Sequence, residues 1–210
     1  MKQKLSDISK DLNRHSQFDG MPSMVFITDR FAVKHPENII DTFPAGSMVI
    51  LRDYDDGNRH NLGAALHYIC QLKHLKFIVA GDVALSLVLG ADGIHLPEKS
   101  INQATDIRKH YPDYFITASV HNEAAIRKAI RNGVDAVLLS PVFSTLSHPE
   151  TIIRPELTLG PKKVKQLCKT YEIPIYGLGG ITIDNAYQLY GTGLCGIAAI
   201  RGFENDTASL

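Results

Sequence analysis

The sequence predicts an α/β fold: a single (β/α)8 TIM barrel with a short or missing last helix. Eight short apolar runs recur along the chain, with amphipathic stretches of helical period between them. A third observation is a five-residue pattern that begins with glycine and occurs three times, at residues 90–94, 133–137 and 193–197. Each copy indicates a helix C-cap glycine, a tight turn and then a strand. Alternating strands and helices form right-handed βαβ units, and eight such units close into a barrel.

The alternative architecture is an open doubly wound sheet. It is disfavoured because no Gly-rich nucleotide-binding loop follows the first apolar run. Most of the eight runs are apolar throughout rather than alternating, which is typical of strands covered on both faces. The predicted strands are residues 24–27, 48–51, 77–79, 93–96, 114–117, 136–139, 175–178 and 196–199.

Helical period predicts the segments between the strands. We expect helices over residues 59–74, 83–89, 122–131 and 185–190, and another with Pro161 in its first turn. Asp82 and Asn122 stand where N-cap residues belong.

The barrel accounts for residues 24–203 as one domain. Residues 1–23 form an N-terminal segment that we expect to include a helix, with residues 4–15 covering part of the barrel wall. Residues 204–210 are left as a C-terminal tail, too short for a full closing helix.

Composition limits the function classes. The 210 residues carry 22 Lys and Arg against 22 Asp and Glu, so nucleic acid and anionic membranes are poor candidates as main partners. No apolar run reaches the roughly 18 residues that a membrane span needs, and no signal peptide is evident. Three cysteines stand far apart without a CxxC pair, which fits a reducing, cytoplasmic location.

Polar, titratable or glycine residues follow the predicted strands, where barrels of this kind place their chemistry. The alternative is that these residues have no functional role and are polar because loops begin at the ends of the strands. These residues are Thr28, Asp29, Arg52, Gly81, Asp82, His95, Ser119, His121, Ser140, Gly179, Gly180 and Arg201.

Two segments are candidate phosphate sites. Gly179-Gly180 follows the seventh strand and precedes a helix start, so its backbone N–H groups suit an anion; the alternative is a tight turn that needs positive φ. The loop after the sixth strand carries Thr145, Ser147 and His148, which suit phosphate oxygens or are part of a solvated surface loop.

Three titratable residues have alternative readings. His121 is a candidate general acid or base. His95 is either a site residue or a hydrogen-bonded lining of the barrel. Asp82 suits Mg²⁺ with waters and a diphosphate, a helix cap, or both.

The chain resembles the superfamily of thiamine phosphate synthases and TenI-type thiazole tautomerases. The resemblance is carried, in family order, by segments 26–29, 49–52, 81–85, 89–96, 118–121, 140–145 and 179–181. It implies a barrel that binds a thiazole phosphate. The synthases join that molecule to hydroxymethylpyrimidine diphosphate and release Mg²⁺-bound diphosphate. The tautomerases move a proton on a thiazole carboxylate phosphate, with a histidine at the place of His121.

The resemblance also implies roles for individual residues. Asp82 would hold Mg²⁺, with Glu98 replacing a second acidic ligand that falls near Ser100, and Gly179-Gly180 would hold the thiazole phosphate. His121 and Ser119 would be the catalytic residues. The diphosphate would be bound by Arg52, Ser119, Thr145, Ser147 and His148.

The sequence departs from the family pattern mainly in the diphosphate clamp. Tyr54 and His148 stand where lysines are usual, and Gly81 replaces an asparagine. Arg201 stands where a small hydroxyl residue is usual, and an arginine can itself bind phosphate.

Three hypotheses stay open. The first is a thiamine phosphate synthase with a partly degraded diphosphate clamp, using Mg²⁺ as cofactor. The second is a thiazole tautomerase, which needs no such clamp. The third is a non-catalytic barrel that binds thiazole or thiamine phosphate. The expected partners are small phosphorylated thiazole and pyrimidine substrates, and a homodimer is an open option.

Overall fold

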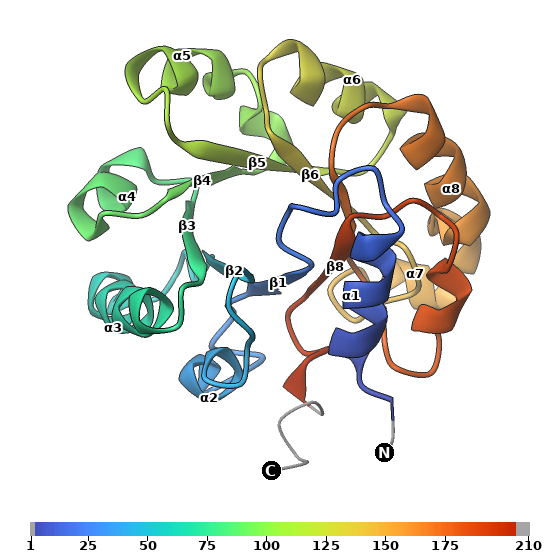
Figure 1. Cartoon of the computed structure of the whole chain (residues 1–210), viewed down its shortest axis with the longest axis horizontal. Coiled ribbons are helices and arrows are strands. Elements are labelled where there is room, and N and C mark those ends of the chain that lie inside the picture. Colours follow the sequence, from blue (N-terminus) through green and yellow to red (C-terminus); the bar gives the residue numbers. More distant parts are fainter. Residues whose placement is uncertain (1–2, 205–210) are drawn as a thin grey trace.

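Eight parallel strands close into a barrel in sequence order in the computed structural model, which describes residues 3–204 (Figure 1). Pairing of β1 with β8, with Val25 opposite Ala198, closes the ring. The predicted barrel is confirmed. The strands are β1 (Met24–Ile27), β2 (Met48–Leu51), β3 (Lys76–Ala80), β4 (Gly93–Leu96), β5 (Phe115–Val120), β6 (Ala136–Leu139), β7 (Ile175–Gly177) and β8 (Gly196–Ala199).

Helices surround the barrel on its outer side (Figure 1). They are α1 (Leu5–Arg14), α2 (Pro36–Ile40), α3 (Arg59–Leu72), α4 (Val83–Leu89), α5 (Gln103–His110), α6 (Glu123–Arg131), α7 (Glu150–Ile153) and α8 (Gly160–Thr170), with the 3-10 turns η1 (Glu98–Ser100), η2 (Pro155–Leu157) and η3 (Ala186–Leu189). The sequence did not predict α2, α5 or α7. The helix expected over residues 185–190 is the 3-10 turn η3.

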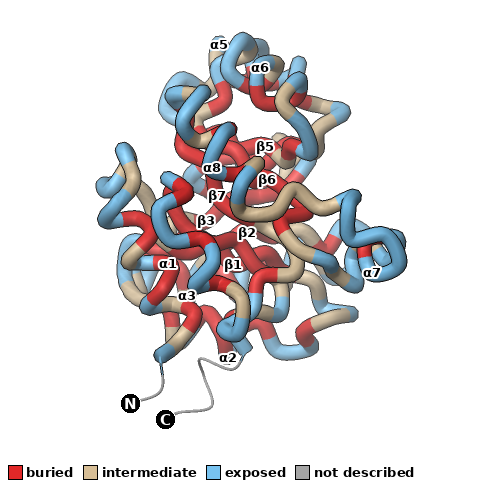
Figure 2. Tube along the Cα trace, turned by 90° about the vertical axis from the view of Figure 1, so that its right-hand side faces the viewer, coloured by how far each residue is buried: buried red, intermediate tan, exposed pale blue. Residues whose placement is uncertain are grey.

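The strands are buried on both faces, which explains their continuous apolar sequence. Val25, Ile50 and Leu138 belong to the cluster inside the barrel. Their neighbours Phe26 and Val49 pack in the larger cluster between the barrel and its helices. Figure 2 shows the same layering: a buried centre of strands and exposed outer turns of the helices, with α7 projecting from the body.

The repeated glycine unit has the same structural role in its first two copies. Gly90 ends α4 in the left-handed conformation at φ 66°, and Gly133 follows α6 at φ 76°. The aspartate two residues later then accepts a hydrogen bond from the backbone of the preceding strand. Asp92 binds the Phe77 N–H and Asp135 the Ile116 N–H, each at 2.7 Å.

The N-terminal helix α1 packs against β1, β8 and η3. Two of its buried polar side chains bind β8 and the turn before it: Ser9 Oγ accepts from the Ile197 N–H at 2.8 Å, and Asn13 donates to the Cys195 carbonyl at 2.8 Å. After β8, residues 200–203 form bends and a turn, and Glu204 is helical. The rest of the predicted tail, residues 205–210, lies outside the described residues. Helix α1 thus covers part of the barrel wall, as predicted.

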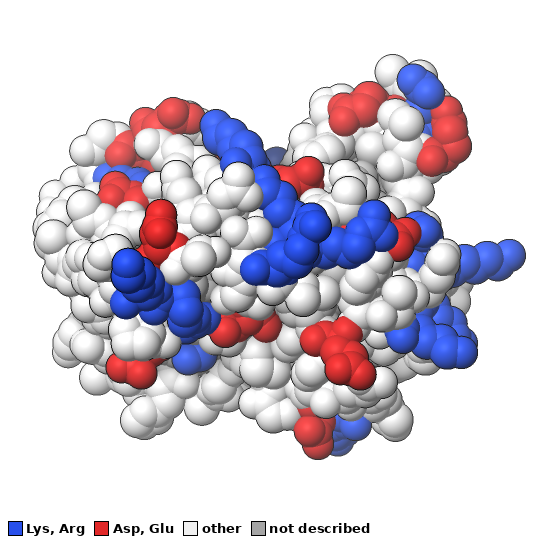
Figure 3. All heavy atoms as spheres, turned by 90° about the horizontal axis from the view of Figure 1, so that it is seen from above, with Lys and Arg blue, Asp and Glu red and all other residues white. Residues whose placement is uncertain are grey.

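Charges of both signs are interspersed on the surface. Figure 3, which looks onto the side of α5 and α6, shows Lys and Arg groups beside Asp and Glu groups and much uncharged surface. Within residues 3–204, no helix combines the length and apolarity needed to cross a bilayer.

Candidate active site

All eight strands are parallel, so their carboxyl ends meet at one mouth of the barrel. Two cavities open there. The β7–β8 cavity, of about 460 Å³, is lined by Gly179, Gly180 and Arg201 together with Thr145 and Ser147 of the loop after β6. The β1–β2 cavity, of about 700 Å³, lies between the loops after β1 and β2, with Arg52 in its lining.

Two glycines shape the β7–β8 cavity by their backbone. Gly179 and Gly180 have φ of +92° and +67°, in the left-handed region. A Cβ on Gly180 would lie 2.3 Å from the Ser144 carbonyl oxygen, and one on Gly179 3.1 Å from Cα of Pro141. The turn therefore packs against the loop after β6 so closely that only glycine fits.

The loop after β6 is held by hydroxyl groups. Thr151 is buried, and its Oγ1 accepts from the Thr145 N–H at 2.9 Å and donates to the His148 carbonyl at 2.6 Å. Ser144 donates to the Thr151 carbonyl at 2.7 Å. The sequence analysis missed Thr151, which no strand end or motif marks. It fixes two of the residues predicted to contact phosphate, Thr145 and His148.

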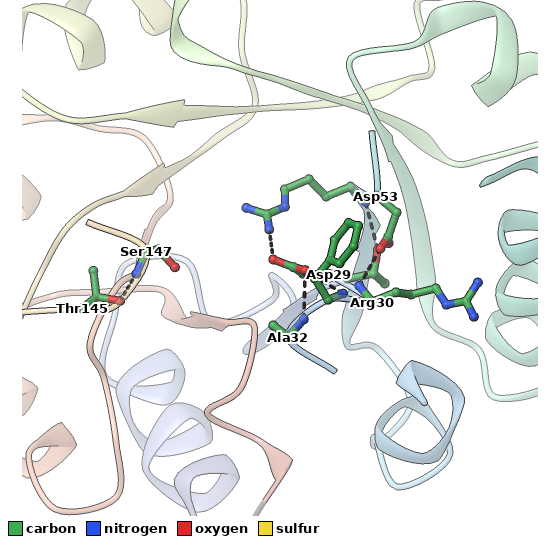
Figure 4. Close-up of polar contacts among 9 residues, drawn as sticks. Asp29, Arg30, Ala32, Asp53, Thr145 and Ser147 are labelled. Atoms are coloured by element: carbon green, nitrogen blue, oxygen red, sulfur yellow. Dashed lines mark hydrogen bonds and ion pairs between the residues drawn. The ribbon is translucent and has the colours of Figure 1, made fainter. Parts of the chain in front are cut away.

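The β1–β2 cavity is lined by two carboxylates, Asp29 and Asp53, that are hydrogen-bonded to neighbouring groups (Figure 4). Asp29 forms an ion pair with Arg52 and accepts from the backbone N–H groups of Phe31 and Ala32, both at 3.1 Å. Asp53 is buried and accepts from the Thr28 hydroxyl and from the Arg30 N–H at 2.7 Å.

Asp53 thus belongs to the candidate site, and the sequence analysis missed it although it directly follows Arg52. Figure 4 places Thr145 and Ser147 apart from this group, so the predicted diphosphate ligands divide between the two cavities. Arg52 belongs to the β1–β2 cavity, and Thr145 and Ser147 to the β7–β8 cavity.

Arg59 is a second missed residue, at the first position of α3. Its guanidinium donates to the carbonyls of Leu51 at 3.2 Å and Ala80 at 2.6 Å, which end β2 and β3. Its Nη1 lies 3.9 Å from Asp82 Oδ2, and its centre lies 5.2 Å from the Tyr54 ring. Burial raises the pKa of Tyr54, so this phenol remains neutral.

His95 joins β4 to β5 inside the barrel. Its Nδ1 lies 2.9 Å from Thr117 Oγ1 and its Nε2 2.9 Å from Ser119 Oγ. Burial, with a smaller contribution from the charge of Arg52, lowers the pKa of His95 from 6.5 to about 4. The ring is therefore neutral at pH 7 and fixes the Ser119 hydroxyl beside the mouth.

His121 follows β5 and contacts three elements. Its Nδ1 lies 2.9 Å from the Ser140 carbonyl oxygen, and its backbone N–H donates to Glu98 Oε2 at 2.9 Å. Its ring centroid is 5.9 Å from that of His148. The structure therefore brings His121, His148 and Glu98 together at the ends of β4, β5 and β6.

The sequence model described as thiamine monophosphate synthase matches residues 24–203, which is most of the chain. A protein of Aquifex aeolicus named "Putative thiamine-phosphate synthase 2" is 31% identical over 190 residues, covering 87% of this chain and 98% of that protein. A thiamine-phosphate synthase of Pediococcus pentosaceus is 30% identical over 148 residues, covering 70% and 67%.

The chain belongs to the thiamine monophosphate synthase family. A solved structure described as thiamine phosphate pyrophosphorylase from Pyrococcus furiosus shares the fold, with a TM-score of 0.73 at 23% identity. The superposition covers 88% of this chain and 91% of that one.

Family membership raises the question of whether Mg²⁺ fits. Asp82 caps α4, its Oδ1 accepting from the Leu85 N–H at 2.9 Å as predicted, yet its side chain is 43% exposed. It can therefore serve as the single carboxylate that Mg²⁺ often takes beside phosphate oxygens and waters. Glu98 stays a prediction as a ligand, since its contact here is the His121 N–H. Within residues 3–204 no group of three His, Cys, Asp or Glu is placed to hold a metal by itself.

Proposed function

We propose that this chain is a transferase of thiamine biosynthesis. It joins hydroxymethylpyrimidine diphosphate to thiazole phosphate, releasing diphosphate and giving thiamine phosphate. The observation that carries the proposal is the pair of cavities at one barrel mouth, because a two-substrate reaction needs two neighbouring sites. Family membership supports the same reaction. The cytoplasm is the proposed location, and a homodimer remains an open prediction.

The β7–β8 cavity would hold the thiazole phosphate. The Gly179-Gly180 turn presents backbone N–H groups without a side chain in the way, and Thr145 and Ser147 add hydroxyl donors. Arg201 is exposed at the end of β8, and among the described residues none accepts a hydrogen bond from its side chain. It is therefore available as a cation for the phosphate.

The β1–β2 cavity would hold the diphosphate end of the pyrimidine substrate. Arg52 supplies a cation together with Arg30 and Lys34, and its pairing with Asp29 fixes the guanidinium in place. Ser119, oriented by His95 on β5, would supply a hydroxyl. Asp82 would hold Mg²⁺, which when bound neutralises charge on the departing diphosphate.

The reaction breaks the bond between the pyrimidine methylene carbon and the diphosphate oxygen, and the oxygen keeps the electron pair. The lone pair of the thiazole nitrogen then forms the new C–N bond. The chain's contribution is to fix both molecules at the mouth and stabilise the leaving anion. Tyr54 and His148, with Ser100 near a further acidic position, supply less charge than the family pattern that the resemblance implies, and each lost charged contact weakens anion binding by about 1.5–3 kcal/mol.

The test is turnover of the two purified substrates with Mg²⁺, followed as thiamine phosphate by chromatography. We expect slow but measurable product, and a rate about 10- to 100-fold lower for Arg52→Gln because the diphosphate loses a cation that is fixed in place. Arg14→Gln is the control, since Arg14 lies on α1 and its ion pair within residues 3–204 is with Asp11. Absence of product at high enzyme concentration refutes the proposal, and ligand binding without turnover would support the non-catalytic hypothesis instead.

A second candidate function is a thiazole tautomerase. One observation favours it: His121 Nδ1 lies 2.9 Å from the Ser140 carbonyl oxygen, which can only accept, and 3.2 Å from the Ser140 hydroxyl, which can also accept. The shorter contact favours the neutral tautomer with its proton on Nδ1. His121 Nε2 then carries a lone pair, as a general base requires. This reaction needs no diphosphate clamp.

A further inference from the structure

A second histidine stands beside His121, on the loop after β6. The rings of His121 and His148 have centroids 5.9 Å apart and are tilted by 44°. In the family pattern the position of His148 belongs to a lysine, which gives up a proton far less readily near neutral pH. The replacement therefore puts a group able to exchange protons where the pattern has a fixed cation.

Burial defines the tautomer of His148. Its Nδ1 is buried and has no hydrogen-bond partner among the described residues. A buried N–H without an acceptor is costly, so the neutral ring keeps its proton on Nε2. His121 shows the opposite arrangement, with the proton on Nδ1 and the lone pair on Nε2. One ring is thus prepared to accept a proton and the other to donate one.

The position of His148 is fixed by the loop. Its backbone N–H donates to the Thr145 carbonyl at 3.0 Å, and its carbonyl accepts from the buried Thr151 hydroxyl at 2.6 Å. Thr145 and Ser147, in the same loop, line the β7–β8 cavity. His148 therefore lies in the loop that borders this cavity, directly after Ser147, with His121 beside it.

We propose that His148 is a second proton carrier, which donates to the substrate while His121 removes a proton from it. The substrate class is a phosphorylated heterocycle with an acidic C–H next to a C=N bond. The proposal rests on the tautomerase candidate and adds the residue that completes the proton shift. His148 is then a catalytic residue rather than a remnant of a diphosphate clamp.

The step is balanced. His121 Nε2 takes the proton from the ring carbon, and the electron pair of that C–H bond forms a new C=N bond to the ring nitrogen. The old C=N π pair forms a new ring C=C bond, and the π pair of the exocyclic C=C bond conjugated with it takes up the proton from His148 Nε2–H, which leaves an aromatic ring. The product is an isomer of the substrate, and no oxidant or reductant is consumed. His121 ends protonated and His148 deprotonated, and exchange with water restores both rings.

The test uses the non-aromatic tautomer of thiazole carboxylate phosphate, labelled with deuterium at the acidic carbon. Conversion to the aromatic tautomer is followed by absorbance, and washout of the label from unreacted substrate by mass spectrometry. We expect His121→Gln to lose both conversion and washout. We expect His148→Gln to lose conversion by about 100-fold or more while washout continues, because His121 still removes the proton.

The outcomes separate the two proposals. A wild-type chain that neither converts nor exchanges the substrate refutes the tautomerase candidate and, with it, this inference. A wild-type chain that converts it, with His148→Gln unchanged, refutes the inference alone. His110→Gln, an exposed histidine at the end of α5, is the matched control.

A further variant excludes a role of His148 in anion binding only. His148→Lys restores a cation but removes the imidazole, so we expect conversion to stay low. Recovery of conversion in His148→Lys would mean that charge, and not proton donation, is what the position supplies, and would overturn the proposal.

Discussion

The two cavities at the barrel mouth are built from different material. The β7–β8 cavity is shaped by backbone, since two glycines with positive φ pack directly on the loop after β6. The β1–β2 cavity is shaped by charged side chains that bind one another: Arg52 to Asp29, and Asp53 to the Thr28 hydroxyl and Arg30 N–H. The binding groups of a cavity formed by backbone depend on the identity of few residues. The binding groups of a cavity formed by paired charged side chains change whenever one of those side chains is replaced.

The difference matches what the resemblance to the synthases implies. In the implied pattern Gly179 and Gly180 are kept, whereas Tyr54 and Gly81, beside Arg52 and Asp82, are departures. Arg59 compensates structurally by joining the ends of β2 and β3, but its guanidinium is occupied with the Leu51 and Ala80 carbonyls. Arg52 therefore shares the β1–β2 cavity with two other cations, Arg30 and Lys34.

The largest effect is expected at the backbone-built cavity, for Gly180→Ala. The new Cβ meets the Ser144 carbonyl oxygen at 2.3 Å and the residue must hold φ +67°, so the turn and the loop after β6 have to separate. We expect the affinity for thiamine phosphate, measured by calorimetry, to fall by about 100-fold.

Gly191→Ala is the control for strain alone. Gly191 has φ +70°, but a Cβ there would meet nothing within 4 Å. It should cost about 1 kcal/mol of the free energy of unfolding and leave affinity unchanged. Equal affinities in both variants would contradict a backbone-built phosphate site.

The barrel and most of its strands were predictable because strands that are buried on both faces have continuously apolar sequences. The N-cap role of Asp82 was predictable because capping is local. Helix α5 was missed because only Ala104 and Ile107 of its eight residues are buried. Helix α7 was missed because it is a short, largely exposed turn.

The candidate site was predictable as a set of strand-end residues but not as a set of contacts. Asp29 and Arg52 are 23 residues apart in the chain, and the parallel pairing of β1 with β2 brings them together as an ion pair. Arg59 follows no motif, since its role depends on the geometry of two neighbouring strands. The division of Thr145 and Ser147 from Arg52 depends on the path of one loop.

A smaller effect, on the pH dependence of stability, is expected at His95, which is buried inside the barrel. Its pKa is about 4 in the folded chain against 6.5 unfolded, so above pH 6.5 both states are neutral and stability is complete. As the pH falls from 6.5 towards 4, only the unfolded chain takes up this proton. Proton uptake by His95 in the unfolded chain should therefore lower the free energy of unfolding by about 2 kcal/mol at pH 5 relative to pH 8.

Urea unfolding at both pH values measures this loss. In His95→Gln the part due to His95 should vanish, whatever the variant does to absolute stability, whereas His110→Gln should retain it. An unchanged pH dependence in His95→Gln would mean that the buried ring is not the group that resists protonation.

The smallest effect is expected at Asp82, where one carboxylate has both a structural and a proposed metal-binding role. Asp82→Asn keeps an oxygen for the Leu85 N–H, and Asp82→Ala removes it. We expect the alanine variant to lose about 1 kcal/mol of the free energy of unfolding and the asparagine variant almost none. Both should lose the Mg²⁺ dependence of diphosphate binding, measured by calorimetry with inorganic diphosphate, because both lack the negative charge. If Asp82→Asn keeps that dependence, Mg²⁺ is bound elsewhere. The charged side chains near the β1–β2 cavity would then pair with one another and bind the substrate rather than a metal.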